Sequence, residues 1–448
     1  MKQNVAIIGA GITGLTIGYY LKKNNIPFKI FEKSPQVGGV IQSIEKEGFL
    51  YEKGPNSGVL SNLELLQLFD ELTERNLSVE IGNAAAKKRL IWKNNQWHAL
   101  PSGLLSAIKT PLFSFSDKIK VLKEPFTKKG NNPNENLTEM VKRRLGNSFL
   151  DYAIDPFISG IYAGNTNELI PRFALPKLYQ LEQDYGSFIK GAIKKAKEPK
   201  TTDEKRLTKD IFSFKGGLSS LPKILAEIIG NENLILSCGD LKIEQKEAEY
   251  TIQNETFTNV ISSIHADSLP KIFSFVQPEE WKNIQNTKYA KIVSVAIGFK
   301  NWSGINLDAF GGLIPTKEHK NILGVLFMST IFKNRAPQNG ALLNVFIGGT
   351  QHPELTELSI PDLKKIIAKD VTEMLQMPQF EPDLFELTYY KKAIAQYDIK
   401  SEQRLKDIAK IEAKYPGILL AGSIRDGVGI ADRVKQASTI AHQIISKK

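Results

Sequence analysis

The sequence predicts an α/β protein, mixed α+β overall, with a nucleotide-binding unit near its N-terminal end. Three observations support this class. An apolar run at 5–8 leads into a glycine-rich turn, a second apolar run at 27–31 follows one helix later, and 417–422 repeats the strand-to-glycine pattern. The first turn has the glycine spacing G-x-G-x-x-G, which is typical of a Rossmann-type βαβ unit that holds the diphosphate of a dinucleotide.

Each residue type in this unit has a physical reason. Gly9 permits a tight turn, Gly11 lets the backbone approach the phosphates, and Gly14 allows the helix to pack closely on the strand. Glu32 ends the second strand, where it can accept a hydrogen bond from a ribose hydroxyl and would repel a 2′-phosphate, so we expect an ADP moiety rather than NADP. The cofactor contacts predicted here are Gly9, Ala10, Gly11, Ile12, Thr13, Gly14, Glu32 and Lys33.

The segment 37–57 indicates that the dinucleotide is a flavin cofactor rather than NAD. An NAD enzyme normally continues into another βαβ unit, whereas this chain makes a paired-glycine turn and then a Gly-Pro turn. Flavoenzymes use such a stretch to cover the rest of an extended FAD, although two ordinary loops are the alternative. The predicted contacts in this segment are Gly39, Val40, Gly54, Pro55, Asn56 and Ser57.

The C-terminal region repeats the opening pattern. A buried strand is expected at 417–422, followed by a glycine loop and an amphipathic helix over 430–445. The start of this helix would offer N–H groups to the negatively charged pyrimidine end of a reduced flavin. The predicted flavin contacts are Gly422, Val428, Gly429 and Ile430.

The middle of the chain divides into a helical block and a strand-rich block, and 448 residues suggest about three structural units at ~150 residues each. Helices are expected from about 90 to 210, where Leu137, Val141 and Leu145 share one helical face. Short strands are expected from about 233 onward, and these first strands lie at 234–236, 241–243, 250–252 and 260–264.

Charge and cysteine content limit the function classes. The net charge is +11, with much of it between 190 and 209, which fits either a solvated linker or attraction to anionic lipid or acidic substrate. Nucleic-acid binding is not expected, because this run lacks interleaved aromatic residues. A single cysteine and scattered histidines predict neither a disulfide framework within the chain nor a metal site. We expect a cytoplasmic protein without a signal peptide or an apolar span of about 18 residues.

Several longer motifs resemble one family. They are DPFISGIYAGN at 155–165, ELIPRFALPKLYQLE at 168–182, FKGGL at 214–218, FGGLIP at 310–315, STIFKNRAP at 329–337, IAQY at 394–397 and AGSIRDGVGIAD at 421–432. The chain resembles the oxygen-dependent, FAD-containing protoporphyrinogen and coproporphyrinogen oxidases of the flavin amine oxidase superfamily. The resemblance extends from the first strand to the last helix.

The resemblance implies a division of the chain into three parts. A discontinuous FAD-binding domain would comprise 1–75, 208–270 and 397–448, and a mixed α/β substrate domain would comprise 76–94 and 271–396. A helical domain, 95–207, would be inserted and associated with the inner face of the cell membrane. Its apolar residues would form either a membrane-contacting surface or an interior face, and they are Leu104, Leu105, Ile108, Leu112, Phe113 and Phe115.

The resemblance also implies an activity: the six-electron oxidation of protoporphyrinogen IX to protoporphyrin IX in haem biosynthesis, with oxygen as acceptor and hydrogen peroxide as product. Arg89 aligns with the arginine that pairs with a substrate propionate, and Leu313 and Phe346 align with the pair that sandwiches a pyrrole ring. Gly160 aligns with the residue whose carbonyl faces the macrocycle. No catalytic acid or base is assigned, because hydride transfer to the flavin needs mainly positioning.

Several alternatives remain at this point. Coproporphyrinogen III is the other porphyrinogen substrate, although Asn56 together with Phe346 resembles the plant type and favours protoporphyrinogen. A flavin amine oxidase, a carotenoid desaturase-like enzyme and a flavoprotein without activity are the other classes. Because family members are often dimers, a homodimer is a further expectation.

Overall fold

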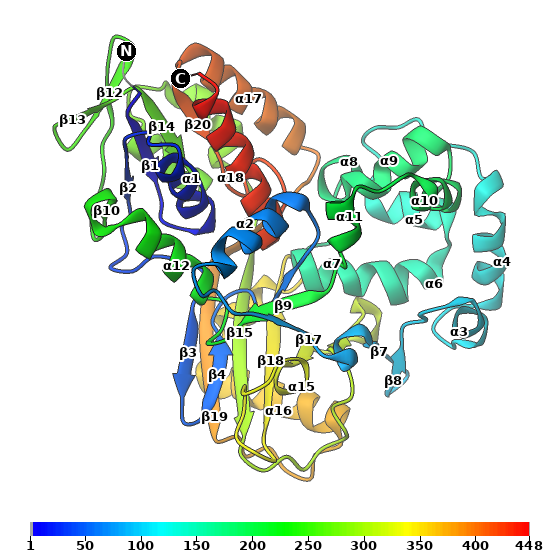
Figure 1. The fold of residues 1–448 in the computed structure, drawn as a ribbon. Helices are drawn as coiled ribbons and strands as arrows, with labels where there is room; N and C mark the ends of the chain where they lie inside the picture. The colour runs from blue at the N-terminus through cyan, green and yellow to red at the C-terminus, as the bar shows by residue number, and fades with distance from the viewer. Residues whose placement is uncertain (1–2, 448) are drawn as a thin grey trace.

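The structure is a computed structural model that describes residues 3–447, except for the side chain of Leu104. A parallel five-stranded sheet lies beneath the two chain ends (Figure 1). Its strands come from both ends and the middle of the sequence, which confirms the expected α/β class with a Rossmann-type βαβ unit. Their order is β10 (Leu234–Ile235), β2 (Phe28–Phe31), β1 (Val5–Ile8), β14 (Asn259–Ser262) and β20 (Ile418–Leu420).

Helices cover both faces of this sheet. On one face α1 (Ile12–Lys23) packs against α18 (Ile430–Ile445) and α12 (Ser220–Ile229), and their shared core includes Leu15, Leu225 and Val434. α2 (Leu63–Thr73) packs on α18 as well. The other face is covered by α13 (Leu269–Ile272), α14 (Pro278–Gln285) and α17 (Ser401–Lys414). The helix predicted at 430–445 therefore closes the same unit that α1 opens.

A seven-stranded mixed sheet forms the second layer of the molecule. One face packs on α16 (Ile360–Leu375), and the opposite face is turned toward α7 (Asp155–Tyr162). All neighbouring strands are antiparallel except β16 and β7. The order is β19 (Leu384–Ala395), β15 (Tyr289–Phe299), β18 (Ala341–Gly348), β17 (Ile322–Phe327), β16 (Gly311–Leu313), β7 (Arg89–Lys93) and β8 (Gln96–Ala99).

Three small sheets accompany these two large ones in residues 3–447. They are the hairpin β3 (Ser43–Lys46)–β4 (Phe49–Glu52), the sheet β5 (Gly58–Val59)–β9 (Ile211–Phe214)–β6 (Val79–Ile81), and the sheet β11 (Glu244–Lys246)–β12 (Glu249–Ile252)–β13 (Glu255–Phe257). The short helix α15 (Met328–Ile331) follows β17. The strand expected at 241–243 is wrong, because the Ile243 N–H donates to the carbonyl of Ile272 (2.9 Å) and pairing begins only at β11.

A helical unit occupies the segment between β8 and β9 (Figure 1). Leu137 and Val141 are buried and Leu145 packs against them, as their spacing predicted. The basic stretch starting at Lys190 is helical and packs on the preceding helix. The helices are α3 (Leu104–Lys109), α4 (Phe115–Lys123), α5 (Leu137–Arg144), α6 (Asn147–Phe149), the π-helical η3 (Leu150–Ile154), α7 (Asp155–Tyr162), α8 (Pro171–Ala174), α9 (Pro176–Tyr185), α10 (Phe188–Lys197) and α11 (Thr202–Arg206).

The apolar residues of α3 and α4 divide between surface and interior. Leu112 and Phe113 are buried against Ile91 and Tyr152, so for these two the interior alternative holds. Their burial is explained by the connection between α3 and α4, which folds back onto β7. In contrast, Leu105, Ile108 and Phe115 are 75%, 61% and 78% exposed, while the side chain of Leu104 lies outside the described residues. Among the helices of residues 3–447, none is both long and apolar enough to cross a bilayer.

A buried ion network holds the helical unit together. Arg144 and Glu124 are fully buried and paired, and Arg144 also reaches Glu182 at 2.7 Å. Arg143 bonds to Glu182 (2.9 Å) and to Glu135 (2.6 Å). Burial alone would raise the pKa of Glu182, but the hydrogen bonds from Arg144 and Arg143 outweigh it and lower the pKa to about 2. The carboxylate therefore contributes stability only while it is ionised.

We expect Glu182→Gln to lower the free energy of unfolding by about 3–5 kcal/mol, because it leaves the Arg144 guanidinium buried with one partner fewer. Urea unfolding followed by circular dichroism measures this change. Glu227→Gln, on an exposed face of α12, is the matched control. In the wild type the contribution of Glu182 is complete above about pH 4.5 and is lost as the pH falls toward 2, since protonation is harder in the folded state. Equal stability of both variants would contradict this role.

Candidate active site

The first glycine turn forms an open cradle at the start of α1. Gly9 has φ +104°, which L side chains rarely adopt, and a Cβ on Gly14 would lie 2.0 Å from the Gly9 carbonyl oxygen. At Gly11, by contrast, a Cβ would meet no atom of the described residues within 4 Å, and none of their side chains caps the first turn of α1. This open space beside uncapped N–H groups fits an anionic diphosphate, as predicted for Gly9 to Gly14.

Glu32 lies at the end of β2, beside this cradle. Its two carboxylate oxygens accept the N–H groups of Ala10 and Ser34, both at 2.8 Å. Each oxygen keeps a second lone pair, so the carboxylate can still accept from a ribose hydroxyl. Lys33 is exposed and bonds to Asp240 instead. The geometry suits the role predicted for Glu32 more closely than the one predicted for Lys33.

The two loops predicted to extend the cofactor site lie against each other. Gly38 bridges to Gly11, and its N–H donates to the carbonyl of Ala10 (2.8 Å). A Cβ on Gly54 would fall 2.0 Å from the carbonyl oxygen of Val40. The structure therefore brings 38–41 and 54–57 together beside the diphosphate cradle, with Gly39 and Val40 exposed there and the amide of Asn56 bonded to Gly54 (3.3 Å).

Glu52 supports the second of these loops and was not anticipated. It is 4% exposed and accepts the Leu218 N–H (2.8 Å) and the Ser43 hydroxyl (2.6 Å). Burial raises the pKa of Glu52 to about 7, although these hydrogen bonds act in the opposite direction. The carboxyl ties the 214–218 motif to the strand that precedes Gly54. A single acidic residue next to a turn gives no sequence signal of such burial.

The C-terminal loop ends at the start of α18. The Gly422 N–H donates to Gln436 (2.7 Å), while those of Val428 and Gly429 donate to the carboxylate of Asp432 at 3.2 and 3.1 Å. Asp432 therefore uses two of the N–H groups that the prediction assigned to a flavin. The backbone N–H groups in the first turn of α18, beginning with that of Ile430, lie at this N-terminal end of the helix. The predicted contact with the flavin would depend on these N–H groups of the first helical turn.

Leu313, Gly324 and Phe346 lie side by side on the face of the seven-stranded sheet that is turned toward α7, and we call this strip of the sheet face the furrow. Gly324 pairs with Leu313 on one side and with Phe346 on the other, so two half-buried apolar side chains flank a residue without a side chain. Gly160 on α7 closes over it, because a Cβ there would lie 2.8 Å from Leu313. Three of the four predicted substrate residues thus meet at one place, and Gly324 is the member that sequence reasoning missed.

Arg89, the fourth predicted substrate residue, lies at the edge of the same sheet face. It pairs in register with Gly311, two pairs before the Leu313–Ile91 pair, which places it about 7 Å further along the strand. The side chain is exposed, and its guanidinium lies 5.7 Å from the ring of Phe310. Within residues 3–447 Arg89 has no acidic partner, so its charge is available to a carboxylate.

Tyr397 joins the furrow to the C-terminal loop. Its hydroxyl contacts the carbonyls of Ser423 (2.8 Å) and Gly427 (2.9 Å), and its ring meets Tyr162 at the end of α7. Val428 and Ile394 pack in this same apolar cluster, and Ile394 also belongs to the cluster of Phe346. A continuous set of contacts therefore runs from the predicted cofactor residue Val428 to the predicted substrate residue Phe346.

Comparison with known proteins places this arrangement in a family. A family model described as flavin-containing amine oxidoreductase matches residues 12–445. The chain is 28% identical to protoporphyrinogen oxidase 2 of Arabidopsis thaliana (99% of this chain, 94% of the relative). It is 26% identical to coproporphyrinogen III oxidase of Bacillus subtilis strain 168 (97% and 96%). A solved structure assigned to protoporphyrinogen oxidase from Exiguobacterium sp. 255-15 has a similar fold, with a TM-score of 0.82 at 22% identity over both whole chains.

We expect Gly11→Val to leave the fold intact and to remove the flavin, because its side chain would fill only the open space of the cradle. Flavin content per folded protein, read from the visible absorbance and the circular dichroism spectrum, measures this. Gly103→Val is the matched control, since a Cβ there also meets no atom within 4 Å and φ is extended. A folded Gly11→Val protein that keeps its flavin would show that the cradle holds no diphosphate.

Proposed function

Because this chain belongs to the flavin-containing amine oxidoreductase family, we propose that it is an FAD-dependent oxidase that converts a porphyrinogen to the porphyrin. One observation carries the proposal: Leu313 and Phe346 lie on either side of Gly324 on one sheet face, and beyond them lies Arg89, which has no acidic partner within residues 3–447. A flat macrocycle with carboxylates on one edge needs both features. Relatives that match nearly the whole chain bear the names of protoporphyrinogen and coproporphyrinogen oxidases.

The expected family, the flavin cofactor and the oxidoreductase class are confirmed by the family match. FAD, when bound, supplies the acceptor for the hydride that leaves the macrocycle. The glycine turn of α1 would hold its diphosphate, Glu32 its ribose, and the loop before α18 its pyrimidine end. The residues that would line its remaining length are those of the packed loops at 38–41 and 54–57.

The chain's own residues would act by positioning. Leu313 and Phe346 would hold a pyrrole ring between them, on either side of Gly324. Gly160 is exposed on the α7 side of the furrow, where its carbonyl would face the macrocycle. Arg89 would bind a propionate through its guanidinium and fix the rotation of the macrocycle. No protein acid or base is required for this role.

The substrate we propose is protoporphyrinogen IX, with oxygen as the acceptor and hydrogen peroxide as the product. Support comes from Asn56, which is buried and bonded within its own turn, so this position offers no charge for additional carboxylates. Coproporphyrinogen III carries four propionates and would need more cations. Comparing kcat/KM for the two porphyrinogens under air, by the fluorescence of the porphyrin formed, tests this choice. A clear preference for coproporphyrinogen would reject it.

The assignment of 1–75, 208–270 and 397–448 to FAD binding, of 76–94 and 271–396 to substrate binding and of 95–207 to a helical unit remains part of the proposal. A homodimer and a location at the cytoplasmic face of the membrane belong to it as well. The membrane contact would be made by exposed apolar side chains on α3, α4 and the turn after α4, which we call the apolar patch. Figure 1 shows α3 and α4 at the outer end of the helical unit, and Lys120 and Lys123 lie in the last turn of α4. This patch consists of Leu105, Ile108, Phe115, Leu122 and Phe126.

We expect Arg89→Met to raise KM for the porphyrinogen and to leave kcat nearly unchanged, because a charge-assisted bond of about 1.5–3 kcal/mol would be lost from binding. Steady-state kinetics under air measure both constants. Lys87→Met, which removes a neighbouring exposed charge, is the control and should retain the wild-type KM. An unchanged KM in Arg89→Met would exclude a propionate contact.

We expect Phe115→Ser to weaken binding to anionic vesicles by about tenfold, since the side chain is 78% exposed and would otherwise enter the interface. Cosedimentation at low salt measures the affinity. Ile360→Ser on α16, which is 54% exposed and lies on the far side of the seven-stranded sheet, should bind as the wild type does. If the wild-type protein does not bind vesicles at low salt, the membrane contact is wrong.

A further inference from the structure

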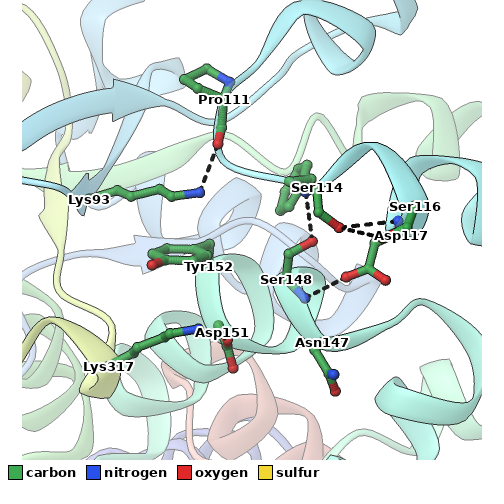
Figure 2. A pocket seen from close by; sticks show the side chains of 11 residues that line it. Lys93, Pro111, Ser114, Ser116, Asp117, Asn147, Ser148, Asp151, Tyr152 and Lys317 are labelled. Carbon is green, nitrogen blue, oxygen red and sulfur yellow. Dashed lines mark hydrogen bonds and ion pairs between the residues drawn. The ribbon is translucent and has the colours of Figure 1, made fainter.

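A cavity of about 390 Å³ lies between β7 and the helical unit, outside the furrow described above (Figure 2). Ile91, Phe113 and Tyr152 form part of the apolar wall that separates it from Leu313. Its volume is within the range of about 300–1,000 Å³ that is typical of small-molecule sites. Its lining is mainly polar and includes Lys93, Lys317, Ser114, Ser116, Ser148 and Asp117.

One side of this cavity is basic. Figure 2 shows Lys93 and Lys317 on opposite faces of the Tyr152 ring, and their ammonium nitrogens lie 4.2 and 5.9 Å from its centroid. Lys317 pairs with Asp151 (2.9 Å). Lys93 donates only to the carbonyls of Pro111 (2.8 Å) and Leu112 (3.0 Å), and it forms no ion pair within the described chain. An ammonium has three N–H donors, so Lys93 keeps one donor and its full charge for an anion.

The opposite side of the cavity carries hydroxyl and carboxylate groups in a fixed arrangement. The Ser114 N–H donates to the Ser148 hydroxyl (3.0 Å), and the Ser148 N–H donates to the Asp117 carboxylate (2.6 Å). The Ser114 and Ser116 hydroxyls lie 3.0 Å apart. A negative group would be repelled by Asp117, whereas an uncharged hydroxyl could donate to it. The cavity is therefore suited to a ligand with an oxyanion at one end and a polyol at the other.

The cavity opens beside the apolar patch of the helical unit. Phe115, which is 78% exposed, lies in sequence between the two lining residues Ser114 and Ser116. Figure 1 places α3 and α4 at the outer end of the molecule, away from the parallel sheet. Lys118 faces this connection as well, donating to the carbonyls of Ile108 and Thr110 (both 2.7 Å). Exposed apolar side chains, a lysine and residues that line the cavity are therefore carried by the same short segment of the chain.

We propose that this cavity binds the phosphate and polyol of an anionic phospholipid headgroup, with the phosphate near Lys93 and Lys317 and the polyol near Asp117. The acyl chains would lie along Phe115 and the other patch residues. Burial lowers the pKa of Lys93, and a neighbouring phosphate would favour its charged form. The proposal rests on the membrane contact proposed above and is independent of the oxidase activity, because none of these residues lines the furrow.

The test compares Lys93→Gln with Lys109→Gln, which removes the same charge from exposed α3 outside the cavity. Binding is measured by cosedimentation with phosphatidylcholine vesicles that contain either phosphatidylglycerol or an equal charge of phosphatidylserine. We expect the wild type to prefer phosphatidylglycerol, Lys93→Gln to lose about tenfold in affinity for it, and Lys109→Gln to lose less than twofold. Lys317→Gln, at a side chain that is 60% exposed, provides a second variant should Lys93→Gln fail to fold.

Other results of these binding measurements would overturn the proposal, and an activity measurement serves as a control. Equal binding to both vesicle types, or equal losses in the cavity variants and Lys109→Gln, would mean that only surface charge matters and would overturn the proposal. If inorganic phosphate stabilised the protein against unfolding while neither vesicle type was preferred, the ligand would be a free oxyanion, and this result would also overturn the proposal. Porphyrinogen oxidation without vesicles should be unchanged in Lys93→Gln and Lys317→Gln, so that failure of this site and failure of the oxidase function are distinguishable.

Discussion

The contact of Tyr397 with the loop before α18 is the constraint on which the proposed active site depends. The parallel sheet and the seven-stranded sheet are separate layers with separate cores, and a reaction between their ligands requires fixed spacing. Tyr397 provides it, because its hydroxyl bonds to the 423–427 loop while its ring packs on Tyr162 of α7. Gln396 reinforces the junction by donating to the carbonyl of Tyr162 (2.9 Å). Both residues are about 1% exposed, so the junction is dry and rigid.

Glycine residues, which carry no side chain, occur in both halves of the proposed site. At Gly11 and in the loops at 38–41 and 54–57, backbone lies next to open space or next to other backbone, which creates room for an extended cofactor. On the seven-stranded sheet, Gly324 is a residue without a side chain that lies between Leu313 and Phe346. The surrounding β-branched and aromatic core keeps these spaces from collapsing. In the proposed function, specificity would depend on charged groups at the edges, above all Arg89.

The helical unit shows how much depends on the packing of neighbouring segments. Leu112 and Phe113 are apolar, as are Leu105 and Ile108 a few residues earlier, yet the first pair is buried and the second exposed. The difference arises because the connection between α3 and α4 folds onto β7, where Lys93 and Lys118 hold its carbonyls. The stretch 241–243 is a similar case, since its apolar alternation suits a strand but its hydrogen bond goes to Ile272. In both places a long-range partner overrides the local pattern.

The sequence by itself determined the βαβ unit, the helix 430–445 and the family, because glycine spacing and hydrophobic periodicity act over short distances and leave a direct trace in the chain. It also identified Leu313, Phe346 and Gly160, through the family resemblance. Only the tertiary structure decided that these residues meet across Gly324, that Asp432 occupies two N–H groups at the start of α18, and that Lys93 and Lys317 flank a cavity. These features join residues far apart along the chain, so they follow from the register of strands and the packing of helices, which no local pattern encodes.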